Sequence, residues 1–243
     1  MKCLNCGQEV TGKFCASCGQ RGDLGRITFR DTIADFLSTL FLIDGPLPQT
    51  LKWLITNPGR LYREFLGGRR KTYYKPLPFF VLCTLLYLVI RSLLHYDPLE
   101  GSFENASADA RPIGAMMKKA SYFMVAYINH IMFILALVLG LFHKMFFPKA
   151  YNLAEYTAVG FYISGVYILA GTLEMITTVY IYPVPKAVQL GFLVAYTFIS
   201  ILSLHRSYKL WSIIRALLAG VFSLIFYMIF GFGVSVLIVW LMG

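Results

Sequence analysis

Four of the five cysteines lie near the N-terminus in two units of identical spacing. Cys3 and Cys6 form one Cys-x-x-Cys-Gly unit, and Cys15 and Cys18 form a second after eight intervening residues. Such a turn brings two thiolates to one ion, and the following glycine allows a tight turn whose amide groups donate toward sulphur. Two units predict a tetrahedral four-cysteine site for structural Zn²⁺, with Zn–S near about 2.3 Å and no open coordination position for catalysis.

Other uses of these cysteines fit the sequence less well. Disulfides are disfavoured because we expect this segment in the reducing cytosol. Haem attachment would need histidine where Gly7 and Gly19 follow the second cysteine of each unit. A rubredoxin-like iron site has the same ligand set, so zinc and iron both stay open. Cys83 lies in a long apolar stretch, where we expect a small buried core residue.

A second chemically distinctive group is a cluster of basic residues, here called the basic collar. Its members directly precede the first long apolar stretch: Arg60, Arg63, Arg69, Arg70, Lys71 and Lys75. Each such residue contributes about 1 kcal/mol of attraction to an anionic leaflet, and the interspersed tyrosines favour the headgroup layer. The collar therefore predicts a topology determinant and interfacial anchor, or else a site for an anionic headgroup or lipid-linked phosphate. Nucleic acid is disfavoured because the segment is held at the membrane.

Polar side chains within apolar stretches are costly in a bilayer and are therefore functional candidates. Arg91 and Glu174 fall in the outer halves of two predicted spans, about 21 and about 25 Å along them at 1.5 Å per residue. Asn129 and His130 fall near the middle of another. An Arg91–Glu174 ion pair with one of these beside it is geometrically allowed. Such a group is either a structural pair that snorkels to the interface or a relay for protons or substrate.

The composition of the whole chain indicates that the elements carrying these residues are membrane helices. Of 243 residues, 58% are hydrophobic and 14% are charged, and the mean hydropathy is +0.64. Soluble domains average about 45–50% apolar and about 25% charged residues. The values indicate an all-α integral membrane protein, and they exclude disordered, collagen-like and disulfide-rich secreted classes.

Five apolar stretches are long enough to cross a hydrocarbon core of about 30 Å as helices. Their approximate bounds are 77–95, 120–142, 157–181, 187–204 and 216–242. We therefore predict a five-helix transmembrane domain over 77–243, preceded by a zinc-ribbon knuckle over 1–25 and a segment of amphipathic helices with the basic collar over 26–76.

The distribution of charge predicts the orientation. With the N-terminus inside, the cytoplasmic segments carry 17 of the 22 Lys and Arg residues, whereas the outside segments carry 4. This asymmetry follows the positive-inside rule. We expect a cytoplasmic N-terminus and an outside, periplasmic C-terminus, which also accounts for most of the net charge of +10.

Three short amphipathic patterns occupy the segment before the first span. Apolar residues recur at helical spacing over 33–41, 47–55 and 61–66, and a capping-box-like pair at Thr28 and Asp31 precedes the first. Each is too short to cross a bilayer. These helices are expected either to lie on the cytoplasmic membrane surface or to pack against the spans, and the sequence does not choose between the two.

Several motifs together resemble a known family. The pattern Cys3 to Gln20 includes Phe14 and is followed by Arg26-Ile27-Thr28, by Asn57-Pro58-Gly59-Arg60 and by Tyr62 to Pro76 leading into the first span. This is similar to bacterial zinc-ribbon membrane proteins grouped as domain-of-unknown-function family 3667, common in Bacteroidota. The resemblance implies a zinc-ribbon head on several spans in the inner membrane, and it implies no activity.

Three classes of function follow from these patterns. The first is an inner-membrane adaptor or scaffold whose zinc ribbon or amphipathic helices engage a protein partner at the cytoplasmic face. The second is a transporter, flippase or scramblase for a lipid or small solute, which would use the basic collar and the polar span residues. The third is an intramembrane enzyme, which is least supported because no Ser/His/Asp set, phosphate-binding glycine loop or paired carboxylate motif is present. We favour the adaptor and expect membrane lipids, some of them anionic, as further partners.

Overall fold

The computed structural model describes residues 1–22, 28–29, 46–99 and 112–241, and its regular elements are helices. The helix predicted over 33–41 and Asp31 of its capping pair lie outside the described residues. Two short helices, α2 and α3, precede six longer ones. The helices are α2 (Pro46–Thr56), α3 (Pro58–Leu66), α4 (Pro76–Leu93), α5 (Pro112–Ala126), α6 (Ile128–Phe146), α7 (Leu153–Tyr180), α8 (Lys186–His205) and α9 (Leu210–Leu241).

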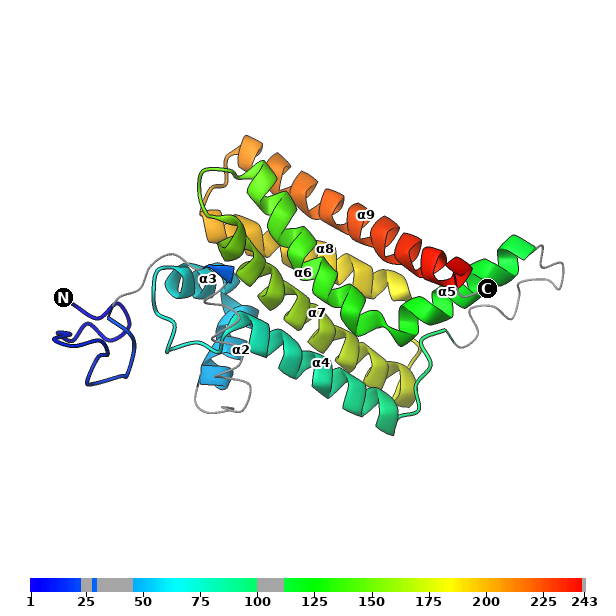
Figure 1. Ribbon diagram of the computed structural model, residues 1–243, viewed down its shortest axis with the longest axis horizontal. Helices are drawn as coiled ribbons and strands as arrows, with labels where there is room; N and C mark the ends of the chain where they lie inside the picture. The colour runs from blue at the N-terminus through cyan, green and yellow to red at the C-terminus, as the bar shows by residue number, and fades with distance from the viewer. Residues whose placement is uncertain (23–27, 30–45, 100–111, 242–243) are drawn as a thin grey trace.

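The long helices form a bundle with α7 at its centre (Figure 1). Helix α7 packs against α4 and α6, and α9 packs against α5 and α6. Small residues permit the close approach of α7 to its neighbours, because a side chain at Gly160 would collide with the carbonyl oxygen of Ala136 on α6. The N-terminal segment and the C-terminal end of α9 lie at opposite ends of the bundle (Figure 1).

Four helices within the described residues are long and apolar enough to cross a membrane. They are Pro76–Leu93, Leu153–Tyr180, Ala187–His205 and Leu210–Leu241. These helices confirm four of the predicted spans and indicate a multi-pass membrane protein.

The single helix expected over 120–142 is wrong, and the count of five spans is not confirmed. The chain turns at Tyr127, whose φ and ψ of −105° and 22° lie outside the helical region, so α5 ends at Ala126 and α6 begins at Ile128. Helix α6, Ile128–Phe146, has 19 residues, and its stretch Met132–Phe146 is apolar. Hydropathy does not detect such a turn, because it averages over residues whatever their backbone conformation.

The second and third of the short predicted helices, α2 and α3, pack against the bundle. Pro58 begins α3, and the Asn57 side chain accepts a hydrogen bond from the Arg60 amide at 3.1 Å. The buried face of α3 includes Leu61 and Phe65. Helix α3 contacts α8 so closely that a side chain at Gly59 would collide with the backbone of Ser203.

An aromatic cluster fixes this docking. Tyr162 of α7 lies at its centre, with ring centroids 5.8 Å from both Tyr62 and Phe65 of α3 and 5.9 Å from Phe79 of α4. The Tyr162 hydroxyl donates to the carbonyl of Tyr74 at 2.5 Å. Burying aromatic rings with satisfied polar atoms is strongly stabilising, so α3 and the start of α4 are held to α7 as one packed unit.

Candidate metal centre

The two cysteine units fold as near copies of one another. In the first, the Gly7 amide donates to the Cys3 carbonyl at 2.9 Å, and the Cys3 amide donates to the Gln8 carbonyl at 2.8 Å. The second unit repeats both bonds with Cys15, Gly19 and Gln20, at 2.8 and 2.7 Å. Gly7 and Gly19 have φ of +80° and +66°, a conformation that favours glycine. Residues 1–22, here called the cysteine lobe, thus place four sulphurs around one point.

The distances between the sulphurs fit a shared ion. All four Sγ atoms of Cys3, Cys6, Cys15 and Cys18 lie within 4.8 Å of one another, with Cys3–Cys18 at 3.6 Å and Cys6–Cys15 at 3.5 Å. Tetrahedral Zn–S bonds of about 2.3 Å require sulphurs about 3.8 Å apart, whereas a disulfide needs about 2.05 Å. The four cysteines can therefore hold a metal ion. The donor set suits zinc and iron alike.

The apolar core of the lobe is too small to hold its fold alone. Within residues 1–22 it comprises Cys3, Val10 and Cys15, with Cys18 packed against them. The backbone adds two isolated antiparallel bridges, Lys2 with Glu9 and Phe14 with Arg21, rather than strands. Segments of this size need a metal or disulfides to stay folded, which is an independent reason to place an ion between the sulphurs.

The electrostatics of the cluster also favour a cation. Backbone N–H groups of Cys6 and Asn5 donate to the Cys3 thiolate and lower the pKa of Cys3 to about 6. Cys6 receives a comparable bond from the Gln8 amide, but burial and the neighbouring sulphurs outweigh it and raise the pKa of Cys6 to about 12. Four thiolates at these distances repel one another, so full ionisation requires a bound cation.

The cysteine lobe is attached to the helical part through the turn that follows α3. Gln20, only 2% exposed, donates from Nε2 to the Gly68 carbonyl at 2.7 Å. The Thr72 hydroxyl also donates to the Asn5 side chain. Gly68 has φ of +114°, and a Cβ there would lie 2.6 Å from Leu4 Cδ1. The sequence analysis did not predict this contact, because it joins segments that are 48 residues apart.

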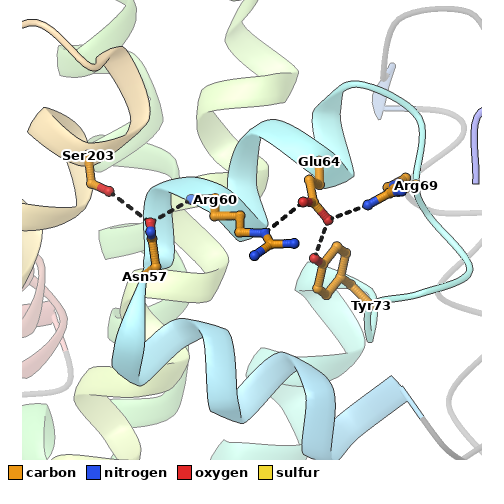
Figure 2. A network of polar contacts seen from close by, with 6 residues as sticks. All are labelled: Asn57, Arg60, Glu64, Arg69, Tyr73 and Ser203. Carbon is orange, nitrogen blue, oxygen red and sulfur yellow. Dashed lines mark hydrogen bonds and ion pairs between the residues drawn. The ribbon is translucent and has the colours of Figure 1, made fainter.

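Directly beneath this turn, Glu64 of α3 is the centre of a polar network (Figure 2). Its Oε1 accepts from Arg60 Nε at 2.8 Å, and its Oε2 accepts from Arg69 Nη1 at 3.0 Å and from the Tyr73 hydroxyl at 2.5 Å. Burial opposes ionisation, but these three donors outweigh it and lower the pKa of Glu64 to about 2. The guanidinium of Arg60 also lies 4.0 Å from the Trp53 ring centroid.

The basic collar is therefore not a uniform charged surface. Arg60 and Arg69 both form ion pairs with Glu64, whose single negative charge offsets one of their two positive charges. Arg63 donates to the carbonyls of Ser203 and Leu204 at the C-terminal end of α8, a favourable place for a cation. Of the other members, Lys71 is exposed, and Arg70 and Lys75 are half-buried. The three residues Arg60, Arg63 and Arg69 thus have structural partners, and a headgroup site on the collar stays a prediction.

The structure describes only some of the polar residues predicted to meet within the membrane. Arg91 donates from Nε to the Tyr96 carbonyl at 3.3 Å and from Nη1 to the Val125 carbonyl at 3.2 Å. It therefore joins the end of α4 to the end of α5. The side chains of Asn129 and His130 lie outside the described residues, and the pairing of Arg91 with Glu174 stays a prediction. Cys83 is buried as expected.

Part of the chain matches a known protein family. Residues 44–88 match the family model described as protein of unknown function (DUF3667). The family expected from the sequence is thereby confirmed over α2, α3, the turn that receives the cysteine lobe, and most of α4. No curated protein and no solved structure matches the chain.

Proposed function

We propose that this multi-pass membrane protein is an adaptor whose cysteine lobe, held together by a structural Zn²⁺ ion, engages a protein partner at the cytoplasmic face of a bacterial inner membrane. The observation that carries the proposal is the attachment of the lobe. Its buried Gln20 binds the Gly68 turn, while Phe14 on the second unit stays 60% exposed. Exposed aromatic residues on a rigid support are typical anchors of protein interfaces.

A scaffolding role also fits the chemistry of the metal site. Four cysteine ligands fill the coordination sphere of zinc, so water and substrate have no position on the metal. The ion then supplies folding energy to the lobe rather than catalysis. An adaptor needs a fixed surface and no reaction centre, so this closed site matches what an adaptor requires.

The alternative is a transporter, flippase or scramblase for a lipid or small solute. The basic collar and the polar span residues favour it, because such residues mark substrate pathways in membranes. The packing weighs against it. Tyr62, Phe65 and Phe79 surround Tyr162 and fill the space between α3, α4 and α7 with aromatic rings, which leaves no room for water between these three helices.

The orientation belongs to the same proposal. The lobe and the C-terminal end of α9 lie at opposite ends of the bundle (Figure 1), so a cytoplasmic lobe places this end of α9 outside. Cysteine accessibility to a membrane-impermeant maleimide tests this: a cysteine introduced at Gly243 should react in intact spheroplasts, whereas one introduced at exposed Lys71 should not. The reverse pattern would contradict the orientation.

The experiment that tests the adaptor role is crosslinking in native membranes followed by purification of the full chain in mild detergent. We expect one stoichiometric protein that is captured by the wild type and by Cys83→Ser, and lost in Phe14→Ala and in Cys3→Ser/Cys6→Ser. Equal capture by all four chains would contradict the proposal. Lipid flux in reconstituted vesicles, absent from protein-free vesicles, would favour the transporter instead.

A further inference from the structure

A cavity separate from the basic collar lies between the α6–α7 loop and the beginning of α9. It has a volume of about 580 Å³ and is lined by residues 145–150 together with Arg215. Within the part of the chain that the structure describes, its charged lining residues are Lys149 and Arg215, and both are cations. Neither forms an ion pair with a carboxylate of the described residues. Two cations in one cavity repel each other and attract an anion.

The cavity is built on a loop that is already held in shape. Lys144 donates from Nζ to the carbonyl of Tyr151 at 3.0 Å and also to the carbonyl of Pro148. These bonds close the loop that carries Lys149 across the end of α6. Arg215 is positioned from the other side, where its guanidinium lies 5.1 Å from the ring centroid of Trp211, one turn earlier on α9. The loop that carries Lys149 and the side chain of Arg215 are therefore preorganised for binding an anion.

Apolar surface continues from the cavity along the bundle. Leu218 and Phe222 follow Arg215 at i+3 and i+7 on one face of α9, and both are exposed, as is Met145 of α6. The rings of Phe142 and Phe146 lie against Phe222, with centroids 6.4 and 6.0 Å away. A soluble anion has no apolar part that could contact this surface, whereas the acyl chains of a lipid would cover it.

The cavity lies at one end of the bundle, which is where the headgroups of a bilayer would surround the helices. The α6–α7 loop and the beginning of α9 lie at the same end of the bundle as α3 and the cysteine lobe (Figure 1). Trp211 is 62% exposed here, and tryptophan favours the interface between headgroups and hydrocarbon. Basic cavities between transmembrane helices on the cytoplasmic side of a membrane bind phosphorylated headgroups, and the proposed orientation puts this end of the bundle on that side.

We propose that Lys149 and Arg215 bind the phosphate of an anionic phospholipid whose acyl chains lie along the exposed faces of α6 and α9. The site does not depend on the adaptor role and shares no residue with the basic collar. Two cations at about 1 kcal/mol each give roughly a 30-fold preference for an anionic over an uncharged surface.

Native mass spectrometry of the full-length, delipidated protein with phosphatidylglycerol tests the site. We expect Lys149→Gln/Arg215→Gln to bind phosphatidylglycerol about 30-fold more weakly than the wild type. The charge-conserving Lys149→Arg/Arg215→Lys should bind within about threefold of it. The matched control is Arg206→Gln/Lys209→Gln, which removes the same charge from exposed residues at the same end of the bundle, outside the cavity, and it should leave binding unchanged.

Three results would overturn the proposal. They are equal loss of binding in the control variant, unchanged binding in Lys149→Gln/Arg215→Gln, and equal binding of zwitterionic phosphatidylcholine by the wild type. Glycerol 3-phosphate supplies the headgroup chemistry without acyl chains. Displacement of phosphatidylglycerol by an equal concentration of glycerol 3-phosphate would assign the cavity to a soluble phosphate and contradict a lipid site.

Discussion

Gln20 Nε2 donates to the carbonyl of Gly68 at 2.7 Å, across 48 positions of sequence. This bond joins the cysteine lobe to the turn that links α3 to α4. Gln20 follows the second cysteine unit, and Gln8 occupies the same position after the first, where its side chain is exposed. The internal repeat of the lobe thus provides two equivalent glutamines, of which Gln20 is buried in the attachment.

The first prediction uses this pair of glutamines. Gln20→Ala should weaken attachment of the lobe by about 0.5–1.5 kcal/mol, because the buried Gly68 carbonyl loses the Gln20 donor and keeps only the bond from the Arg70 amide. Hydrogen–deuterium exchange of the full chain should show faster exchange over 1–22 and over the Gly67–Tyr73 turn. Gln8→Ala is the matched control and should exchange like the wild type. Equal exchange in both variants would show that Gln20 does not hold the lobe.

The second prediction concerns the metal. Elemental analysis of the purified chain should find about one metal ion per protein, retained in Cys83→Ser and lost in Cys6→Ser, because Cys6 belongs to the cluster and Cys83 does not. Zinc should leave the visible spectrum empty, whereas iron would give thiolate-to-metal absorption bands. Chelation should remove exchange protection from the lobe and leave α4 and α7 protected. A lobe equally protected with and without metal would refute the structural role.

The third prediction is a dependence on pH. The pKa of Glu64 is lowered from 4.5 to about 2 by Tyr73, Arg60 and Arg69 acting against burial. Its ionised form therefore stabilises the fold above about pH 4.5, and this contribution is lost as the pH falls toward 2. Glu64→Gln should lower stability by about 1 kcal/mol at pH 7, which is the scale of exposed ion pairs. Thermal unfolding of this variant should change less between pH 5 and pH 3 than that of the wild type.

The control for the pH experiment is Glu9→Gln, since Glu9 is exposed and lies outside the network. This variant should keep the full acid sensitivity of the wild type. Loss of the proposed metal ion at low pH should affect the wild type and both variants alike, so the difference between the variants isolates Glu64. Identical pH profiles for Glu64→Gln and the wild type would show that the network adds no stability.

The fourth prediction tests the docking of α3 against α8. Gly59→Ala should destabilise the protein by about 1–3 kcal/mol, because the new Cβ would collide with the backbone of Ser203. Gly191 lies in α8 with no atom within 4 Å of the position of a Cβ. Gly191→Ala should therefore be neutral or stabilising by about 0.5–1 kcal/mol. Thermal unfolding in one detergent compares the two, and equal effects would mean that α3 is not tightly docked.

Much of the architecture could be predicted from local pattern alone. The pairing of Cys3 with Cys6 and of Cys15 with Cys18 predicted a cluster because a turn of fixed length sets where both sulphurs point. The spans at α4, α7, α8 and α9 were predictable because crossing a bilayer demands a long uninterrupted apolar helix. The family match over residues 44–88 was predictable because two of the motifs, Asn57 to Arg60 and Tyr62 to Pro76, lie within it.

What only the tertiary structure decided are the contacts between distant segments. The sequence marked Arg60, Arg63 and Arg69 as one basic surface, but their carboxylate and carbonyl partners divide them into different roles. It also gave no sign of the turn at Tyr127, or of which glutamine would meet Gly68. Composition and periodicity report what each segment buries or exposes. Which donor meets which acceptor depends on how helices pack, and that packing is a property of the folded chain as a whole.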